Sequence, residues 1–130
     1  MLISYLKKYT FSILIVLTIV YLSLFKPPKT SLSDIQNLDK LVHFCMYGGL
    51  SGVIWLEYLI AHKNKFSFKP IFLLGIIFPI LLGGSMELAQ KYLTSHRSGD
   101  WLDFYANTTG VIVASLIGYF VLRPLLKKFN

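Results

Sequence analysis

Ionisable side chains recur at helical spacing where an apolar segment begins. Asp39, His43 and Tyr47 are four residues apart, so a helix would place them on one face, and Lys40 stands three residues before His43. A carboxylate, an imidazole, a phenol and an ammonium group at one place suit acid–base chemistry or recognition of a polar ligand.

Two further segments carry polar residues of the same kind. Glu87 and Gln90 are three residues apart and Asp103 and Asn107 are four apart, so each pair shares a helical face. Glu87 follows a charge-free run, and an intramembrane carboxylate costs on the order of a few kcal/mol unless it is paired or protonated. The expected partners of Glu87 are His43, Arg97 and Lys40. The candidate polar site is Asp39, Lys40, His43, Tyr47, Glu87, Gln90, Arg97, Asp103 and Asn107.

The elements that must hold these residues are apolar. Hydrophobic residues make up 55% of the 130-residue chain, and the mean hydropathy is +0.60. A soluble domain of this size has too little interior for so much apolar surface, whereas about 20 apolar residues suffice to cross a bilayer as a helix. We therefore predict an all-α polytopic membrane protein, a single domain over 1–130 with a four-helix transmembrane bundle. The expected spans are about 9–25, 41–60, 70–92 and 101–122.

Antiparallel threading of these spans brings the polar residues together. The start of the second span, the end of the third and the start of the fourth must lie on one side of the bilayer. At about 1.5 Å per residue, His43, Glu87 and Asn107 then lie at similar depth. The sequence therefore predicts one polar pocket lined by three helices.

The distribution of basic residues predicts the orientation. The net charge of +7 comes from Lys and Arg at the segment ends, which excludes a single nucleic-acid-binding patch and fits juxtamembrane anchors. More of these residues lie on the side of the termini than on the side of the polar residues. We therefore expect a multi-pass membrane protein with both termini cytoplasmic and the pocket facing outward.

In order and spacing, the polar residues resemble a known family. Asp39-Lys40-x-x-His43-Phe44-x-x-Tyr47, then Glu87-x-x-Gln90, Arg97 and Asp103-x-x-x-Asn107-x-x-Gly110, look like the VanZ-like family of small bacterial membrane proteins. The resemblance covers about residues 39–118. The namesake of that family is associated with resistance to teicoplanin, a lipid-tailed glycopeptide. The resemblance implies a cell-envelope setting in the bacterial inner (plasma) membrane, with a membrane lipid, a lipid-linked cell-wall precursor, a lipoglycopeptide or another membrane protein as partner.

Three functions remain open from the sequence. The polar groups could recognise a headgroup or a partner protein, could form a membrane-embedded enzyme acting on a lipid-linked substrate, or could be a purely structural polar core. In an enzyme, Glu87 and His43 would be the acid–base pair, and Lys40 and Arg97 would hold a phosphate or carboxylate. No nucleophile motif is present and Cys45 has no obvious base, so we favour recognition or structure over catalysis.

Other residues have plainer interpretations. Asp100 is expected to cap the last helix, and Glu57 to be interfacial and structural. Gly83 and Gly84 could bend the third span. No cofactor and no metal are predicted: Asp39, His43, Glu87 and Asp103 offer one imidazole among carboxylates, and Lys40 and Arg97 would compete for the acids. The small residues expected to pack helices closely are Gly48, Gly52, Gly110, Ala114 and Gly118.

Overall fold

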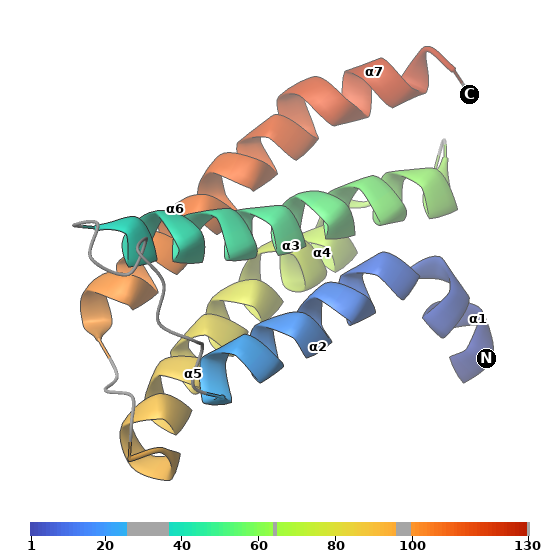
Figure 1. The fold of residues 1–130 in the computed structure, drawn as a ribbon. Coiled ribbons are helices and arrows are strands. Elements are labelled where there is room, and N and C mark those ends of the chain that lie inside the picture. Colours follow the sequence, from blue (N-terminus) through green and yellow to red (C-terminus); the bar gives the residue numbers. More distant parts are fainter. Residues whose placement is uncertain (26–36, 64, 96–99, 130) are drawn as a thin grey trace.

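The computed structural model describes residues 1–25, 37–63, 65–95 and 100–129. This part of the chain is all-helical, as predicted, and contains no strand (Figure 1). The elements in chain order are α1 (Leu2–Lys8), α2 (Thr10–Leu24), α3 (Leu38–His62), α4 (Phe68–Ile71), the π-helical segment η2 (Phe72–Ile77), α5 (Phe78–Leu93), α6 (Trp101–Ile117), the π-helical segment η3 (Gly118–Leu122) and α7 (Arg123–Lys127).

Three helical runs in the described residues are long and apolar enough to cross a membrane. They are Leu38–His62, Phe68–Leu93 and Trp101–Lys127, with 25, 26 and 27 residues. At about 1.5 Å per residue, each is longer than the roughly 30 Å hydrocarbon core. The first predicted span differs: α2 has 15 residues and meets α1 at an angle of 81°, so a fourth span exists only if this bent pair crosses as one unit.

Helix α3 is the centre of the assembly and packs most extensively against α6. The two backbones approach closely where Gly110 faces Phe44 and Gly48. A Cβ atom on Gly110 would collide with the Phe44 carbonyl oxygen, and one on Gly48 would lie 3.2 Å from the Gly110 carbonyl oxygen. Only glycine therefore allows this crossing at its observed distance.

Both π-helical segments precede a proline. Pro79 follows η2 and Pro124 follows η3, and each proline lacks the N–H that the carbonyl four residues earlier would accept. For Pro79 that carbonyl belongs to Gly75, and it accepts a hydrogen bond from the Ser51 hydroxyl at 2.6 Å. Helix α5 continues through Gly83 and Gly84, and the π-helical irregularity of this run lies before Pro79.

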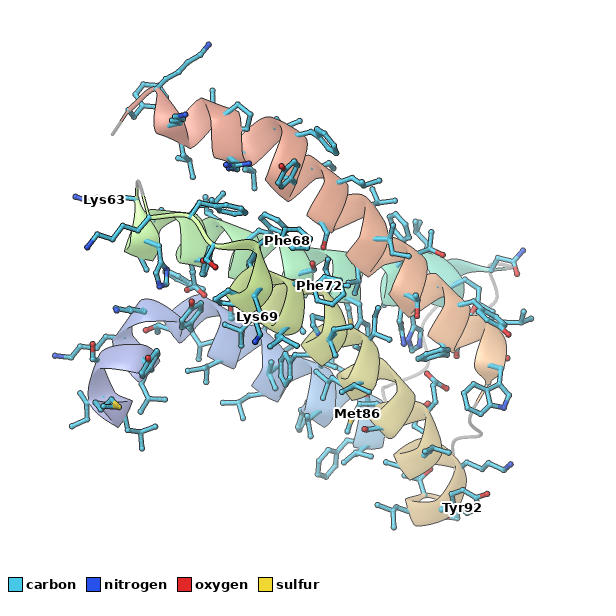
Figure 2. The ribbon with its side chains drawn as sticks, turned by 180° about the vertical axis from the view of Figure 1, so that it is seen from behind. Lys63, Phe68, Lys69, Phe72, Met86 and Tyr92 are labelled. Atoms are coloured by element: carbon cyan, nitrogen blue, oxygen red, sulfur yellow. The ribbon has the colours of Figure 1, made fainter. Side chains whose placement is uncertain are left out.

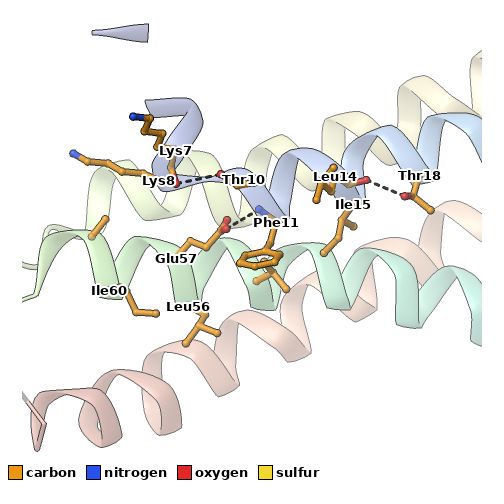
Figure 3. Close-up of a pocket in the computed structure, with 12 residues that line it drawn as sticks. Lys7, Lys8, Thr10, Phe11, Leu14, Ile15, Thr18, Leu56, Glu57 and Ile60 are labelled. Atoms are coloured by element: carbon orange, nitrogen blue, oxygen red, sulfur yellow. Dashed lines mark hydrogen bonds between the residues drawn. The ribbon is translucent and has the colours of Figure 1, made fainter. Parts of the chain in front are cut away.

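The junction of α1 and α2 is held by Glu57, which is buried on α3. The Glu57 carboxylate accepts hydrogen bonds from the backbone N–H groups of Phe11 and Ser12, at 2.9 and 3.2 Å, and from the Ser12 hydroxyl. The N–H groups of a helix's first turn have no partner within the helix, so Glu57 caps α2 from a neighbouring element. Beside it, an open and mainly apolar groove of about 780 Å³ runs between α2 and α3 (Figure 3).

The two ends of the assembly differ in composition. Both chain termini lie at one end, together with the end of α3 (Figure 1). Figure 2 shows Lys63 at this end and Tyr92 at the opposite end, where α5 finishes. The starts of α3 and α6 lie with the end of α5, as antiparallel threading requires, and this end carries the polar cluster.

Candidate functional site

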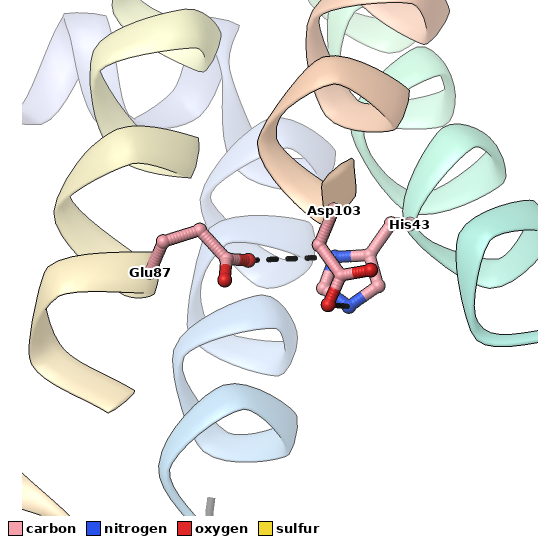
Figure 4. A group of neighbouring side chains, drawn as sticks. All are labelled: His43, Glu87 and Asp103. Atoms are coloured by element: carbon pink, nitrogen blue, oxygen red, sulfur yellow. Dashed lines mark ion pairs between the residues drawn. The ribbon is translucent and has the colours of Figure 1, made fainter. Parts of the chain in front are cut away.

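The polar cluster is built from the first turns of α3 and α6 and the last turns of α5. Its described members are Asp39, Lys40, His43, Glu87, Asp100, Asp103 and Asn107. Three helices that are distant in the sequence thus place His43, Glu87 and Asp103 side by side (Figure 4).

Lys40 lies among three carboxylates. Its Nζ atom is 3.0 Å from Asp39 Oδ2, 2.8 Å from Asp100 Oδ2 and 2.6 Å from Asp103 Oδ1. A lysine ammonium group has three N–H donors, and these contacts engage all of them. Lys40 therefore has no donor left for a phosphate or carboxylate, which is the role that an enzyme mechanism would give it.

His43 contacts three groups around its ring. His43 Nδ1 hydrogen-bonds to Asn107 Oδ1 at 3.0 Å. The same nitrogen is 4.0 Å from Glu87 Oε1, and His43 Nε2 is 3.6 Å from Asp103 Oδ2. Both carboxylates lie beyond hydrogen-bonding distance, so they attract a charged imidazole ring only through space.

Asp100 links the cluster to the start of α6. Its Oδ1 atom accepts the Leu102 N–H at 2.9 Å, and its own backbone N–H donates to Glu87 Oε2 at 2.9 Å. The hydrogen bond from Lys40, with that from the Leu102 N–H, holds the pKa of the Asp100 carboxyl below its usual range. Asp100 is thus both a helix cap and a member of the cluster. From the sequence, the cap was favoured over membership of the site.

Exposure falls from the end of the helices inward. The side chains of Asp39 and Asp100 are 61% and 41% exposed, whereas that of Glu87 is 4% exposed. The cluster therefore has an exposed mouth and a buried floor, and the floor consists of His43, Glu87, Asp103 and Asn107.

Charge in the cluster is unbalanced. Four carboxylates, those of Asp39, Glu87, Asp100 and Asp103, face one ammonium group and one imidazole. The described residues therefore leave an excess of negative charge. In a poorly hydrated environment that excess favours a positively charged partner.

Two predicted members, Gln90 and Tyr47, stand apart from the cluster's hydrogen bonds. Gln90 is buried, but its Nε2 donates to the Ser23 carbonyl oxygen at 3.0 Å and so ties α5 to α2. Tyr47 is also buried, and its ring packs close to Gly83. Arg97 lies outside the described residues.

The remaining small residues occupy close contacts between helices. A Cβ atom on Gly83 would lie 3.1 Å from Asn107 Nδ2, so Gly83 allows the floor of the cluster to pack against α5. Gly118 lies under the Trp55 ring, and a Cβ atom on Gly52 would lie 4.0 Å from the Ala114 Cβ. Sequence analysis missed the Ser51 and Ser115 pair, whose hydroxyls lie 3.1 Å apart in the core and whose types alone gave no signal.

Comparison with known proteins finds no match: no protein-family model, no curated protein and no solved structure is detectably similar to this chain. The structure by itself defines the class, an all-helical protein with several helices able to span a membrane.

Proposed function

We propose that this chain is a VanZ-like integral membrane protein of the bacterial cell envelope. Its polar cluster recognises the headgroup of an envelope lipid or of a lipoglycopeptide at the outer face of the plasma membrane. Support for the family comes from the order and spacing of the polar residues. Support for a recognition site comes from their convergence at one end of three helices. A role in teicoplanin resistance is one form that this function could take.

One observation favours a positively charged ligand group. Lys40 donates its three N–H groups to Asp39, Asp100 and Asp103. The Glu87 carboxylate has no ammonium partner among the described residues. A phosphate would meet carboxylates at the mouth and would have to displace one of them from Lys40. An amine would find unshared carboxylate oxygens. We therefore assign the site to a headgroup that carries an amine.

The alternatives have less support in the described residues. His43 hydrogen-bonds there only to Asn107, so no hydroxyl or thiol is positioned beside it as a nucleophile. A purely structural core would satisfy its own charges, whereas the residues of this cluster that the structure describes leave a carboxylate excess. A site that binds a ligand without turnover fits both the lack of a positioned nucleophile and the carboxylate excess.

The test compares lipids that differ in the headgroup amine. The purified full chain, kept in a metal chelator, is presented with equal amounts of phosphatidylethanolamine and phosphatidylglycerol, and retained lipid is measured by native mass spectrometry. We expect at least a fivefold preference for the ethanolamine lipid. Asp39→Asn at the mouth and Glu87→Gln at the floor should each reduce that preference, because each removes a negative charge.

Glu57→Gln is the matched control. It also neutralises a buried carboxylate on a membrane helix, but at the opposite end of α3. It should leave the lipid preference unchanged even where it lowers stability. If the wild-type protein shows no headgroup preference, the proposed function is wrong. If all three variants lose lipid equally, retention reflects folding and the cluster is structural.

A further inference from the structure

The three ionisable groups on the floor of the cluster are each held by one atom. His43 Nδ1 is bonded to Asn107 Oδ1, Glu87 Oε2 accepts the Asp100 N–H, and Asp103 Oδ1 accepts from Lys40. No described residue donates a hydrogen bond to the remaining atoms, His43 Nε2, Glu87 Oε1 and Asp103 Oδ2. Each side chain is thus anchored at one atom and offers another.

The ligand atoms of these groups converge. One ligand atom from each of His43, Glu87 and Asp103 lies within 4.8 Å of the others, and all three residues are buried (Figure 4). Ligands at about 2.1 Å from a common metal ion are roughly 3–4 Å apart. The 3.6 Å between His43 Nε2 and Asp103 Oδ2 already falls in that range.

The hydrogen bond of His43 decides which ring nitrogen is free. Asn107 Oδ1 can only accept, so His43 Nδ1 must carry the proton and donate it. In the neutral ring, Nε2 then presents a lone pair towards the Asp103 carboxylate, which also can only accept. Two acceptors facing each other beside a further carboxylate repel, and a cation between them relieves that repulsion.

We propose that His43, Glu87 and Asp103 bind a divalent first-row transition-metal ion. The set is not merely acidic: an imidazole nitrogen with two carboxylates suits Zn²⁺ or Mn²⁺ better than Mg²⁺ or Ca²⁺, which prefer oxygen ligands throughout. Asn107, Lys40 and the Asp100 N–H are the outer partners that orient the ligands, as metal sites require.

This inference deepens the proposed function, on which it rests, because the ion would form the floor of the headgroup site. Three protein ligands leave coordination positions open for water or for an oxygen of the bound headgroup. Lys40 does compete for two of the acids, as expected, since it binds Asp39 and Asp103, but it leaves ligand atoms free. Lys40 takes only one oxygen of Asp103 and none of Glu87.

The experiment measures metal binding directly. The purified full chain is stripped with chelator and titrated with Mn²⁺, and separately with Zn²⁺, with bound metal measured by mass spectrometry and calorimetry. We expect one ion per chain. Glu87→Gln and Asp103→Asn should each weaken binding at least tenfold, and Asn107→Ala should weaken it by about 10- to 100-fold, as removal of an outer partner does elsewhere. Glu57→Gln should bind as the wild type does.

A second measurement does not depend on whether variants fold. Pulsed electron paramagnetic resonance of the Mn²⁺-loaded wild type should show coupling to an imidazole nitrogen. Absence of that coupling, less than about a tenth of an ion bound per chain, or unchanged affinity in folded Glu87→Gln would each overturn the proposal.

The two proposals can be contradicted separately. If the protein prefers the amine headgroup in chelator but binds no metal, only the metal-site proposal is wrong. If the protein binds metal but shows no headgroup preference, either with or without the ion, only the recognition function is wrong.

Discussion

At the scale of single residues, Lys40 determines how the cluster's charges are shared. Its contacts with Asp39, Asp100 and Asp103 bridge the starts of α3 and α6. Glu87 accepts its hydrogen bond from the backbone N–H of Asp100 instead. An ammonium group whose three N–H donors are all engaged by carboxylates has a structural role. It cannot also bind an anion without losing one of these partners.

The lowered pKa of Asp100 predicts a pH-dependent contribution to stability. Because Lys40 and the Leu102 N–H stabilise its charged form, the folded pKa lies below the unfolded value of about 3.9. The stabilisation is therefore present above that value and is lost as the pH falls through the lowered pKa.

We expect Asp100→Asn to lower the free energy of unfolding at pH 7 by less than about 1 kcal/mol, since the side chain is well exposed. Asn keeps the helix cap, so the change isolates the charge. Thermal unfolding in detergent from pH 7 to pH 2.5 should show the difference between the two proteins vanish in acid. A difference that does not vary with pH would contradict this account.

At the scale of elements, the crossing of α3 and α6 positions the floor of the cluster. His43 and Asn107 come from these two helices, close to the contact of Gly110 with the Phe44 carbonyl: His43 precedes Phe44 directly, and Asn107 lies three residues before Gly110. The opposing atom is backbone, which cannot turn aside as a flexible side chain can. The separation of the two helices, and hence the geometry of the site, depends on that missing Cβ.

Gly110→Ala should therefore destabilise the protein by at least about 1–3 kcal/mol, in the range of overpacked cores. Gly49→Ala is the matched control, because nothing lies within 4 Å of its added Cβ and alanine is the better helix former. Thermal stability of both variants in one detergent checks the prediction. Equal stability of the two would show that the close approach is not needed.

At the scale of the whole molecule, both termini lie at the end opposite to the polar cluster (Figure 1). Together with the bias of Lys and Arg towards the terminal side, this predicts that the cluster faces outward. The chain contains one cysteine, Cys45, which can be removed to give a background for labelling.

In a Cys45→Ala background, Tyr92→Cys should react with a membrane-impermeant thiol reagent in intact cells, because Tyr92 is exposed at the cluster end. Lys127→Cys should react only after the cells are permeabilised. The measurement is the labelled fraction in each condition. Labelling of Lys127→Cys in intact cells, with protection of Tyr92→Cys, would reverse the orientation.

The fold was predictable where composition alone controls it. Long apolar runs must be helical in a bilayer, and three such helices appear where they were expected. The angle of 81° between α1 and α2 was not predictable, because it depends on Glu57, which lies 45 residues from Ser12 in the chain. The π-helical segment before Pro79 likewise has a partner in another helix, because the Gly75 carbonyl accepts from Ser51.

The sequence by itself determined which residues share a helical face and which ends of the helices share a side, because both follow from the period of the helix and from antiparallel threading. Only the tertiary structure decided which polar groups meet. In the structure, Gln90 donates a hydrogen bond to the Ser23 carbonyl rather than joining Glu87 in the cluster, and Lys40 donates one to Asp100. Such pairings depend on the rotation and separation of neighbouring helices, which are set by contacts between residues distant in the chain, such as Gly110 with Phe44.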